Sequence, residues 1–427
     1  MKRGFYTIIA AQFFSSLADN ALLIAAIALL IEMQAPAWMT PLLKLSFTIS
    51  YVMLAPFVGA VADSFRKGRV MLVTNAVKMI GCLLMFMTLH PVLAYGVVGF
   101  GASAYSPAKY GILTELLPPE KLVAANGWIE GATVGSIIIG TLIGGALIHP
   151  DIAGLLLSID LPGIDLGIDT PASAAITVIA GIYFIAGILN LWIVDTGARY
   201  KAQQRNPLRL IADFARANVM LWSDRLGQIS LSVTTLFWGA GATLQFIVLD
   251  WAREALDMSL DKAAVLQGIV AVGIAFGAVA AARHVPLRRS LRILPVGVAM
   301  GLVVPLMTLI ETTALAVPLL VIVGLLAGFF VVPMNALLQH RGHVLLSAGH
   351  SIAVQNFNEN MNILLMLGLY AWLLGSDLSV NAVICMFGGF IAVTMVLVIV
   401  VHARNQKRFD SESLIGQHKP LRDPDLT

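Results

Sequence analysis

A lysine, Lys109, stands inside an apolar stretch of the chain, in the sequence Ser-Pro-Ala-Lys-Tyr-Gly-Ile-Leu. The hydrophobic run around it, residues 91–117, is long enough to cross a bilayer as a helix at about 1.5 Å per residue. A charge inside such a run is costly in lipid, so it must face a polar interior, a partner or water. Pro107 removes a helical hydrogen bond two residues earlier and loosens the backbone beside the charge. Lys109 is therefore the first candidate for a functional side chain, because a buried ammonium can bind an anionic group.

Other apolar runs carry carboxylates and amides. Asp19 and Asn20 interrupt the first run, and Gln12 and Ser16 lie on the same side of that helix. The resulting polar stripe predicts residues that line a cavity. A hydrogen bond between two helices is the alternative interpretation.

Asn126 and Glu130 lie one turn apart, on one face of the helix expected over 121–149. Glu130 is the deeper of the two and needs a cation nearby. Lys109 is the obvious partner, and Asp19 competes for the same lysine.

The densest polar group lies in the run over 344–374, which contains Gln355, Asn356, Asn358, Glu359, Asn360 and Asn362. Four of these residues, at 355, 358, 359 and 362, follow helical spacing and share one broad face. No lipid-facing helix could carry them. We therefore expect Gln355, Asn356 and Glu359 to line a functional cavity, with a purely structural polar core as the alternative.

Two further polar residues lie within spans. Lys78 is about two turns from the inner end of the run over 71–89. Its long stem favours snorkelling to the interface, and a functional role within the bundle is the alternative. Gln245, in the run over 227–252, is expected to be buried because of its depth in the membrane.

A motif of one aspartate and several cations connects the second and third runs. Its residues are Gly59, Asp63, Lys67 and Arg69, with Arg66 beside them. An aspartate at a helix end, followed by basic residues, can lock neighbouring helices by ion pairing. The motif predicts a gate or hinge, and the ordinary enrichment of cations at inner turns is the alternative.

Composition limits the classes of protein. Hydrophobic residues make up 58% of the chain and charged residues 12%, against about 25% charged in soluble domains. The net charge of +3 is small and dispersed, which argues against nucleic acid as a partner. Cys82 and Cys385 lie in separate runs and no metal-ligand spacing occurs, so we expect no disulfide, metal or cofactor. The motifs of hydrolases and ATPases are missing, so an enzyme is not expected.

Twelve apolar runs predict an all-α membrane protein with twelve transmembrane helices. The runs are 5–31, 42–62, 71–89, 91–117, 121–149, 173–195, 227–252, 264–282, 293–310, 315–339, 344–374 and 380–401. With the N-terminus inside, 22 of the 27 Lys and Arg lie in inner segments and 3 in outer loops. The positive-inside rule then places both termini in the cytoplasm.

A long basic linker over 196–226 divides these runs six and six. It predicts one six-helix bundle over 1–195, a second over 227–402 and a polar cytoplasmic tail over 403–427. Three echoes in corresponding segments favour duplicated halves with a pseudo-two-fold repeat. Gly-Ala-Val-Ala recurs at 59 and 277, Pro107-Ala-Lys is echoed by Pro333-Met-Asn, and the spacing of Asn126 and Glu130 is echoed by Gln355 and Glu359.

The motif from Gly59 to Arg69, in a duplicated twelve-span chain, resembles that of the major facilitator superfamily. Within that superfamily, several stretches resemble the bacterial lysophospholipid transporters. They are Ala-Asp-Asn-Ala-Leu-Leu (18–23), Ala-Pro-Phe-Val-Gly-Ala-Val-Ala-Asp-Ser-Phe-x-Lys-Gly-Arg (55–69), Tyr-Ser-Pro-Ala-Lys-Tyr-Gly-Ile-Leu (105–113), Phe-Phe-Val-Val-Pro-Met-Asn-Ala-Leu-Leu-Gln (329–339) and Ile-Ala-Val-Gln-Asn-x-x-Glu-Asn (352–360).

The resemblance implies a flippase in the bacterial inner membrane, surrounded by membrane lipids. It would move lyso-phosphatidylethanolamine from the outer to the inner leaflet, where an acyltransferase/acyl-carrier-protein synthetase restores the missing chain. Members of the family often carry a cation in the seventh span where this chain has Gln245, so Lys109 would carry more of the phosphate binding here.

On this interpretation the polar residues divide between the parts of the headgroup. Lys109 would bind phosphate, and the carboxylates of Asp19, Glu130 and Glu359 would bind the ammonium. The amides would bind glycerol and phosphate; they are Asn20, Asn126, Gln245, Gln355 and Asn356. A proton-coupled drug or metabolite exporter of the same superfamily is the alternative, and a lipid-modifying enzyme is a third reading.

Overall fold

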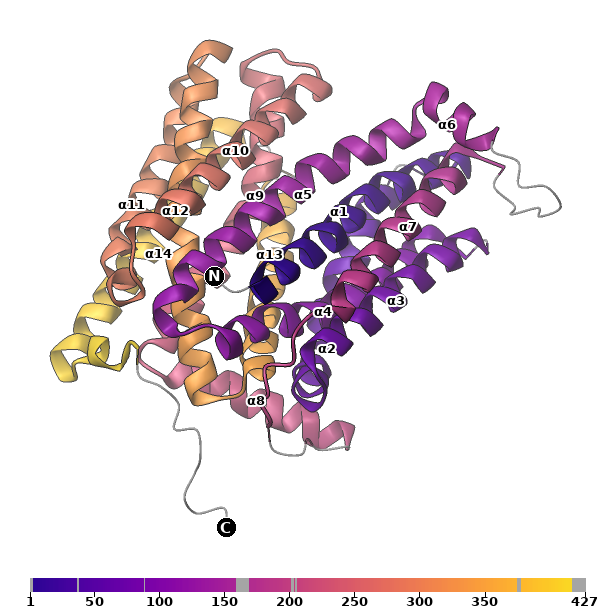
Figure 1. Ribbon diagram of the computed structural model, residues 1–427. Coiled ribbons are helices and arrows are strands. Elements are labelled where there is room, and N and C mark those ends of the chain that lie inside the picture. The colour runs from indigo at the N-terminus through magenta and orange to yellow at the C-terminus, as the bar shows by residue number, and fades with distance from the viewer. Residues whose placement is uncertain are drawn as a thin grey trace. The chain divides into compact units, whose positions relative to one another are not determined.

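The computed structural model describes residues 3–36, 38–87, 89–158, 169–200, 203, 206–374 and 378–416. Within these ranges the chain forms fourteen α-helices and four short 3-10 helices, and no strand (Figure 1). The predicted all-α class is confirmed. Residues 417–427 of the predicted tail lie outside the described residues.

Each of the twelve apolar runs corresponds to helical structure. The first six are α1 (Arg3–Glu32), α2 (Met39–Ser64), α3 (Lys67–Phe86), α4 (Pro91–Leu116), α5 (Leu122–Ile148) and α7 (Pro171–Leu191). The second six are α9 (Gly227–Ala255), α10 (Leu260–His284), α11 (Leu294–Val303), α12 (Thr313–Leu345), α13 (Ala348–Leu374) and α14 (Val380–Arg408). The run with α11 is broken, because η2 (Leu287–Ile293) precedes α11 and η3 (Val304–Leu309) follows it.

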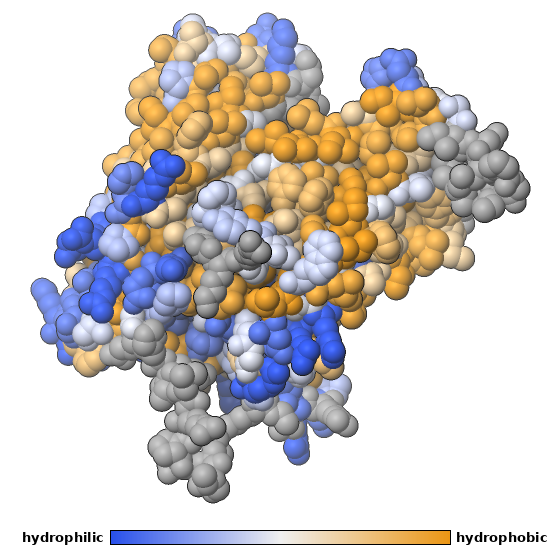
Figure 2. All heavy atoms as spheres, viewed as in Figure 1, coloured by the Kyte–Doolittle hydropathy of each residue, from blue (hydrophilic) through white to orange (hydrophobic). Residues whose placement is uncertain are grey.

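Ten helical stretches in the described part of the chain are long and apolar enough to cross a membrane. The sides of the helices are covered mainly by hydrophobic residues (Figure 2), as contact with lipid tails requires. The chain is therefore a multi-pass membrane protein. Among the helices that correspond to the twelve runs, α4 and α13 are outside this set of ten. Helix α4 carries Lys109, and helix α13 carries the dense group of amides. The count of twelve spans stays a prediction.

Two helices occur where the sequence predicts only connections. A short helix, α6 (Pro150–Leu157), follows α5 directly, with Pro150 in its first turn. A longer helix, α8 (Pro207–Ser223), occupies much of the predicted linker. Its apolar residues recur at helical spacing, so the average polarity of the linker was a misleading guide to its structure.

The chain divides into two compact units. Unit 1 comprises Met1–Ile112 and Ala132–Leu210, and unit 2 comprises Leu113–Gly131 and Ile211–Thr427. The first part of α5 thus groups with the C-terminal half of the chain, whereas its second part groups with the N-terminal half.

Small residues on α1 allow close packing in unit 1. The buried core of this unit includes Ala18, Ala21 and Ala25 of α1. A Cβ atom at Gly140 of α5 would lie 2.5 Å from the carbonyl oxygen of Leu17, so α5 packs directly on the α1 backbone. This packing positions the stretch of α1 that carries Asp19.

Glycines on both partners bring α10 and α12 together in unit 2. Gly273 and Gly277 of α10 face Gly324 and Gly328 of α12. A Cβ at Gly277 would lie 2.1 Å from the carbonyl oxygen of Leu325, and a Cβ at Gly328 would lie 2.1 Å from that of Ile274. Such small-residue contacts are typical of helix pairs in membranes, where van der Waals packing drives association.

We predict that Gly277→Ala lowers the thermal unfolding midpoint of the purified protein, because the added methyl group must push α10 and α12 apart. Overpacking of this kind costs about 1–3 kcal/mol. Gly268→Ala on the same helix is the matched control, since a Cβ there meets nothing within 4 Å. Equal midpoints for the two variants would contradict the close contact.

Candidate substrate-binding and gating residues

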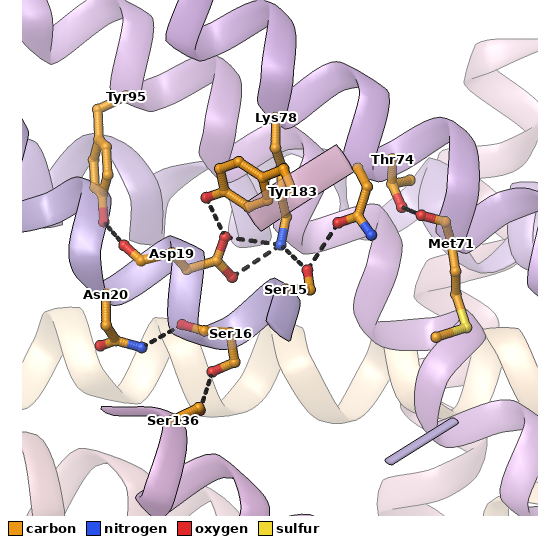
Figure 3. A network of polar contacts seen from close by, with 11 residues as sticks. Ser15, Ser16, Asp19, Asn20, Met71, Thr74, Lys78, Tyr95, Ser136 and Tyr183 are labelled. Carbon is orange, nitrogen blue, oxygen red and sulfur yellow. Dashed lines mark hydrogen bonds and ion pairs between the residues drawn. The ribbon is translucent and has the colours of Figure 1, made fainter. Parts of the chain in front are cut away.

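A buried ion pair joins α1 to α3 in unit 1. Lys78 Nζ lies 2.8 Å from Asp19 Oδ1 and 2.9 Å from Asp19 Oδ2 (Figure 3). The Lys78 side chain is 1% exposed and that of Asp19 is 19% exposed. The lysine is thus enclosed in the helix bundle, and the carboxylate is the more accessible end of the pair.

Hydroxyl groups and aromatic rings complete the surroundings of this pair. Tyr183 of α7 donates a hydrogen bond to Asp19 Oδ1 at 2.7 Å, and Tyr95 of α4 donates to the Asp19 carbonyl oxygen at 3.3 Å (Figure 3). Lys78 also donates to Ser15 Oγ at 3.0 Å, and its ammonium lies 5.0 Å from the centroid of the Tyr105 ring. Four helices therefore share the stabilisation of one buried ion pair.

The expectation that Lys78 snorkels to the interface is wrong. Asn75, one turn earlier, accepts a hydrogen bond from Ser15 at 2.8 Å, so Asn75 and Lys78 both face α1. The sequence did indicate that Lys78 is buried: Asn75 and Lys78 share one face of α3, and Asp19 on α1 needs a cation. Distance along the helix from its end did not reveal which way the side chain points.

The remaining polar stripe of α1 is largely used in helix packing. Gln12 donates to Thr133 Oγ1 of α5 at 2.9 Å, and Ser136 of α5 donates to Ser16 Oγ at 2.8 Å. Asn20 donates to the carbonyl oxygen of Ser16 at 2.7 Å, within its own helix. Part of the predicted cavity lining is therefore a set of α1–α5 hydrogen bonds, which was the alternative interpretation.

Lys109 is half-buried on α4, and its ammonium lies 4.2 Å from the centroid of the Tyr110 ring. Asp19, the competing partner in the sequence analysis, pairs with Lys78. Because Lys109 belongs to unit 1 and Glu130 to unit 2, their pairing stays a prediction.

Unit 2 contains a buried ladder of amides. Asn126 of α5 and Gln339 of α12 exchange two hydrogen bonds, of 2.8 and 2.9 Å. Both residues are at most 1% exposed. Sequence reasoning selected Asn126 but missed Gln339, whose position one turn after Asn335 on an apolar helix was the available signal.

A second hydrogen-bonded group in unit 2 joins two carboxylates through Asn335 and Gln355. Gln355 donates to Glu359 Oε1 at 2.8 Å and to Asn335 Oδ1 at 3.1 Å. Asn335 in turn lies 3.5 Å from Glu130 Oε1, at the long limit for a hydrogen bond. The structure thus brings Glu130, Gln355 and Glu359 into one connected group, all of them buried.

The single broad face predicted for α13 divides among several neighbours. Asn358 donates to Asn218 of α8 at 2.8 Å, whereas Asn362 donates to the carbonyl oxygen of Thr235 of α9 at 2.8 Å. Asn356 is buried. Residues separated by three, four and seven positions cover a wide arc, so different helices can pack on different parts of it.

Gln245 is exposed, contrary to the expectation of burial. It donates to Gln267 Oε1 of α10 at 3.2 Å, and Gln267 donates back to its carbonyl oxygen at 2.7 Å. Depth along a spanning helix does not decide whether a side chain faces the packed interior, which explains the error.

The motif between α2 and α3 forms two ion pairs. Lys67 lies 2.9 Å from Asp63 Oδ1 and also donates to the carbonyl oxygen of Ala62, so it ties the end of α2 to the start of α3. Arg66 pairs with Asp195, after α7, at 2.8 Å. Gly59 is buried and Arg69 is exposed. Hydrogen bonds from Arg199 and from the Gly197 N–H hold the pKa of Asp195 below its usual value.

An ion pair that the sequence did not reveal lies in unit 2. Asp224, between α8 and α9, accepts two hydrogen bonds from Arg341 of α12, at 2.9 and 2.7 Å. Burial raises the pKa of Asp224, but these bonds and that from the Gly227 N–H outweigh it and hold the pKa below 3.8. The geometry is bidentate, which gives the contact both strength and direction.

Comparison with known proteins supports the fold. The family description "Major Facilitator Superfamily" matches residues 8–360. Solved structures of FucP in the outward conformation and of a bacterial homologue of the iron transporter ferroportin give TM-scores of 0.70 and 0.71. The matches cover 94% and 95% of this chain, and 98% and 100% of those chains. At 11% and 13% sequence identity they show the fold alone.

Curated relatives are much more similar in sequence. "Lysophospholipid transporter LplT" of Yersinia pestis (strain Pestoides F) is 42% identical over 373 residues, which is 87% of this chain and 87% of the relative. The protein of the same name in Yersinia pseudotuberculosis serotype I (strain IP32953) matches to the same extent.

The family match over residues 8–360, with the all-helical fold, identifies a membrane transporter of the Major Facilitator Superfamily. Within that superfamily, the chain belongs to the lysophospholipid transporter family.

We predict that Lys78→Met destabilises the protein strongly, because it leaves Asp19 without its cation. Breaking a buried pair costs about 3–5 kcal/mol, and the partial exposure of Asp19 makes the lower end applicable. The double variant Asp19→Asn/Lys78→Met should recover much of the loss in thermal unfolding midpoint. The exposed lysine in Lys121→Met is the control, and an additive loss in the double variant would argue against the pair.

We predict that acid weakens the Asp224–Arg341 contact in a defined range. A carboxyl with a lowered pKa stabilises the fold above its usual value of 3.8, and this stability is lost as the pH falls through the lower folded value. Asp224→Asn should lower the unfolding midpoint at neutral pH and flatten its decline between about pH 5 and about pH 3. Asp151→Asn is the control, because that side chain is 90% exposed. Parallel pH curves for wild type and Asp224→Asn would contradict the assignment.

Proposed function

We propose that this chain is a lysophospholipid flippase of the bacterial inner membrane. It moves lyso-phosphatidylethanolamine and related lysolipids from the outer to the inner leaflet, where a cytoplasmic acyltransferase/acyl-carrier-protein synthetase reacylates them. The observation that carries the proposal is the 42% identity to LplT over 87% of both chains. The positive-inside distribution of Lys and Arg supports twelve spans in two six-helix bundles, with both termini in the cytoplasm.

The headgroup is the part of the substrate that needs the protein most. A zwitterionic headgroup cannot enter the hydrocarbon region without partners for its phosphate and ammonium. The single acyl chain can remain among lipid tails while the headgroup crosses. Transport therefore requires a polar route for one small group, and the substrate-binding residues are expected along that route.

Lys109 is the proposed phosphate ligand. Lys109 is half-buried on α4, whereas the Lys78 side chain is enclosed in the helix bundle and 1% exposed. A hydrogen bond between an ammonium and a phosphate is charge-assisted and therefore among the stronger polar contacts.

The carboxylates Asp19, Glu130 and Glu359 are the proposed ligands of the ammonium. Asp19 is accessible on one side despite its pairing with Lys78. The amides Asn20, Asn126, Gln245, Gln355 and Asn356 are proposed to bind glycerol and phosphate oxygens. Gln355 has a buried side-chain oxygen without a hydrogen-bond partner, so this amide can accept a bond without breaking one.

Asp63, Lys67, Arg69 and Gly59 are proposed as a gate at the turn between α2 and α3. The Asp63–Lys67 pair fixes this turn, and burial of Gly59 one helical turn earlier keeps α2 tightly packed there. The gate would act by holding helix ends together rather than by binding substrate.

We predict that Lys109→Ala lowers uptake of labelled lyso-phosphatidylethanolamine by about tenfold or more, because a hydrogen bond to a charged group contributes about 1.5–3 kcal/mol. Uptake would be measured in spheroplasts that lack their own transporter, with the amount of protein in the membrane determined in parallel. Lys121→Ala, at an exposed lysine, is the matched control. Full uptake by Lys109→Ala would remove the phosphate assignment, and absence of uptake with the unaltered protein would refute the function.

A further inference from the structure

Helix α8 presents three distinct faces. Phe214, Ala217 and Leu221 are buried. The charged side chains of Arg209, Asp213 and Arg216 form a second face. A third face consists of exposed apolar residues at helical spacing, namely Leu208, Ile211, Ala215, Val219 and Trp222.

The buried face fixes α8 to α13. The rings of Phe214 and Phe357 meet edge to face, with 5.3 Å between their centroids. Asn358 receives a hydrogen bond from Trp222 Nε1 at 3.0 Å and donates one to Asn218 at 2.8 Å. These contacts fix the rotation of α8 about its own axis. Trp222 forms the edge of the stripe next to α13, and Leu208, Ile211 and Val219 are its exposed part.

The apolar stripe is unusually open for a connecting segment. Leu208 is 76% exposed and Val219 is 63% exposed. In water such a row of large side chains would be costly, at roughly 25 cal/mol for each Å² of apolar surface. The stripe therefore implies an apolar environment for this side of the helix.

We propose that α8 lies in the interface of the lipid bilayer, with its apolar stripe among the outer parts of the acyl chains. The helix crosses α13 rather than running along it (Figure 1), and it meets α13 at Phe357 and Asn358. With the membrane span predicted for α13, α8 lies roughly in the plane of the bilayer. Arg209 lies on the neighbouring face, where it can reach lipid phosphates, whereas Arg216 on the same face pairs with Asp213. Trp222 combines a partly exposed ring with a bonded N–H. Apolar, aromatic and basic residues in this arrangement are the signature of an interfacial helix.

The shape of the stripe fits a lipid surface better than it fits a protein partner. The stripe is narrow, continuous along the helix and bordered by arginines, which suits a planar boundary between lipid tails and phosphates. Since α8 is held on a membrane helix, no other occupant is needed to cover the stripe.

The test uses spin labels on single cysteines in the full-length protein, in the Cys82→Ser/Cys385→Ser background. Ile211→Cys and Val219→Cys place the label in the stripe, and Arg216→Cys places it on the charged face as the matched control. The protein would be reconstituted into vesicles of phosphatidylethanolamine and phosphatidylglycerol. Collision rates with oxygen, which concentrates in lipid, and with a water-soluble nickel complex would be compared.

We expect the oxygen-to-nickel ratio at 211 and 219 to exceed that at 216 by several-fold. Equal ratios at the three positions would place the stripe in water and overturn the proposal. Low collision rates with both reagents at 211 and 219 would mean that protein covers the stripe, and would also overturn it. Because the measurement does not depend on transport, it succeeds or fails independently of the proposed function.

A second measurement guards against distortion by the labels. Val219→Glu should lower the unfolding midpoint of the protein in these vesicles, because the carboxylate must enter the interface, whereas its midpoint in detergent should change less. Met220→Glu, on the charged face of α8 and also exposed at 47%, should have little effect in either medium. A Val219→Glu variant as stable as wild type in vesicles would contradict the proposal.

Discussion

The requirement that no charge be left unpaired in an apolar interior governs the structure of unit 1. Lys78 has lost nearly all contact with solvent, and an isolated ammonium in that position would strongly destabilise the bundle. Two carboxylate oxygens, a serine hydroxyl and aromatic rings replace its hydration. These groups come from different helices, so the helices must approach closely enough to share one cation. Gly101 of α4 allows the close approach to α3, because a Cβ there would lie 2.7 Å from Lys78 Cγ and 2.7 Å from the carbonyl oxygen of Thr74.

Unit 2 uses neutral amides beside its buried carboxylates, in addition to the Asp224–Arg341 ion pair. Asn126 and Gln339 satisfy each other, and Gln355 supplies a hydrogen bond to Glu359. Amides carry donors and acceptors without net charge, so their desolvation costs much less than that of ions. An amide can also exchange partners by rotating its side chain, whereas an ion pair has to be separated. The amide ladder is therefore the part of the protein better suited to exchange its hydrogen bonds with a polar substrate.

The sequence predicted the helices and the polar residues within them, but not how those residues are paired. Asp19, Glu130 and Glu359 were recognisable because a carboxylate in an apolar run has few alternatives. Lys78 was misassigned because a lysine near a helix end has two solutions, snorkelling and burial, and only the position of α1 decides between them. The expectation that Gln245 is buried was wrong for a related reason. The depth of a residue in the membrane does not say in which direction its side chain points around the helix axis. The Asp224–Arg341 pair joins residues 117 positions apart, and no local pattern connects them.

Two of the ion pairs at helix ends, Asp63–Lys67 and Asp224–Arg341, differ in the helix motions that would break them. Asp63 and Lys67 are four residues apart, in one turn, so their contact survives any motion that carries α2 and α3 together. Asp224 and Arg341 belong to segments that meet only through tertiary packing, and two parallel hydrogen bonds hold them in one orientation. A shift of α12 relative to the start of α9 must break this contact, because a bidentate pair tolerates little rotation. The local pair therefore stabilises a turn, whereas the distant pair stabilises one particular arrangement of helices and would have to open if that arrangement changes during transport.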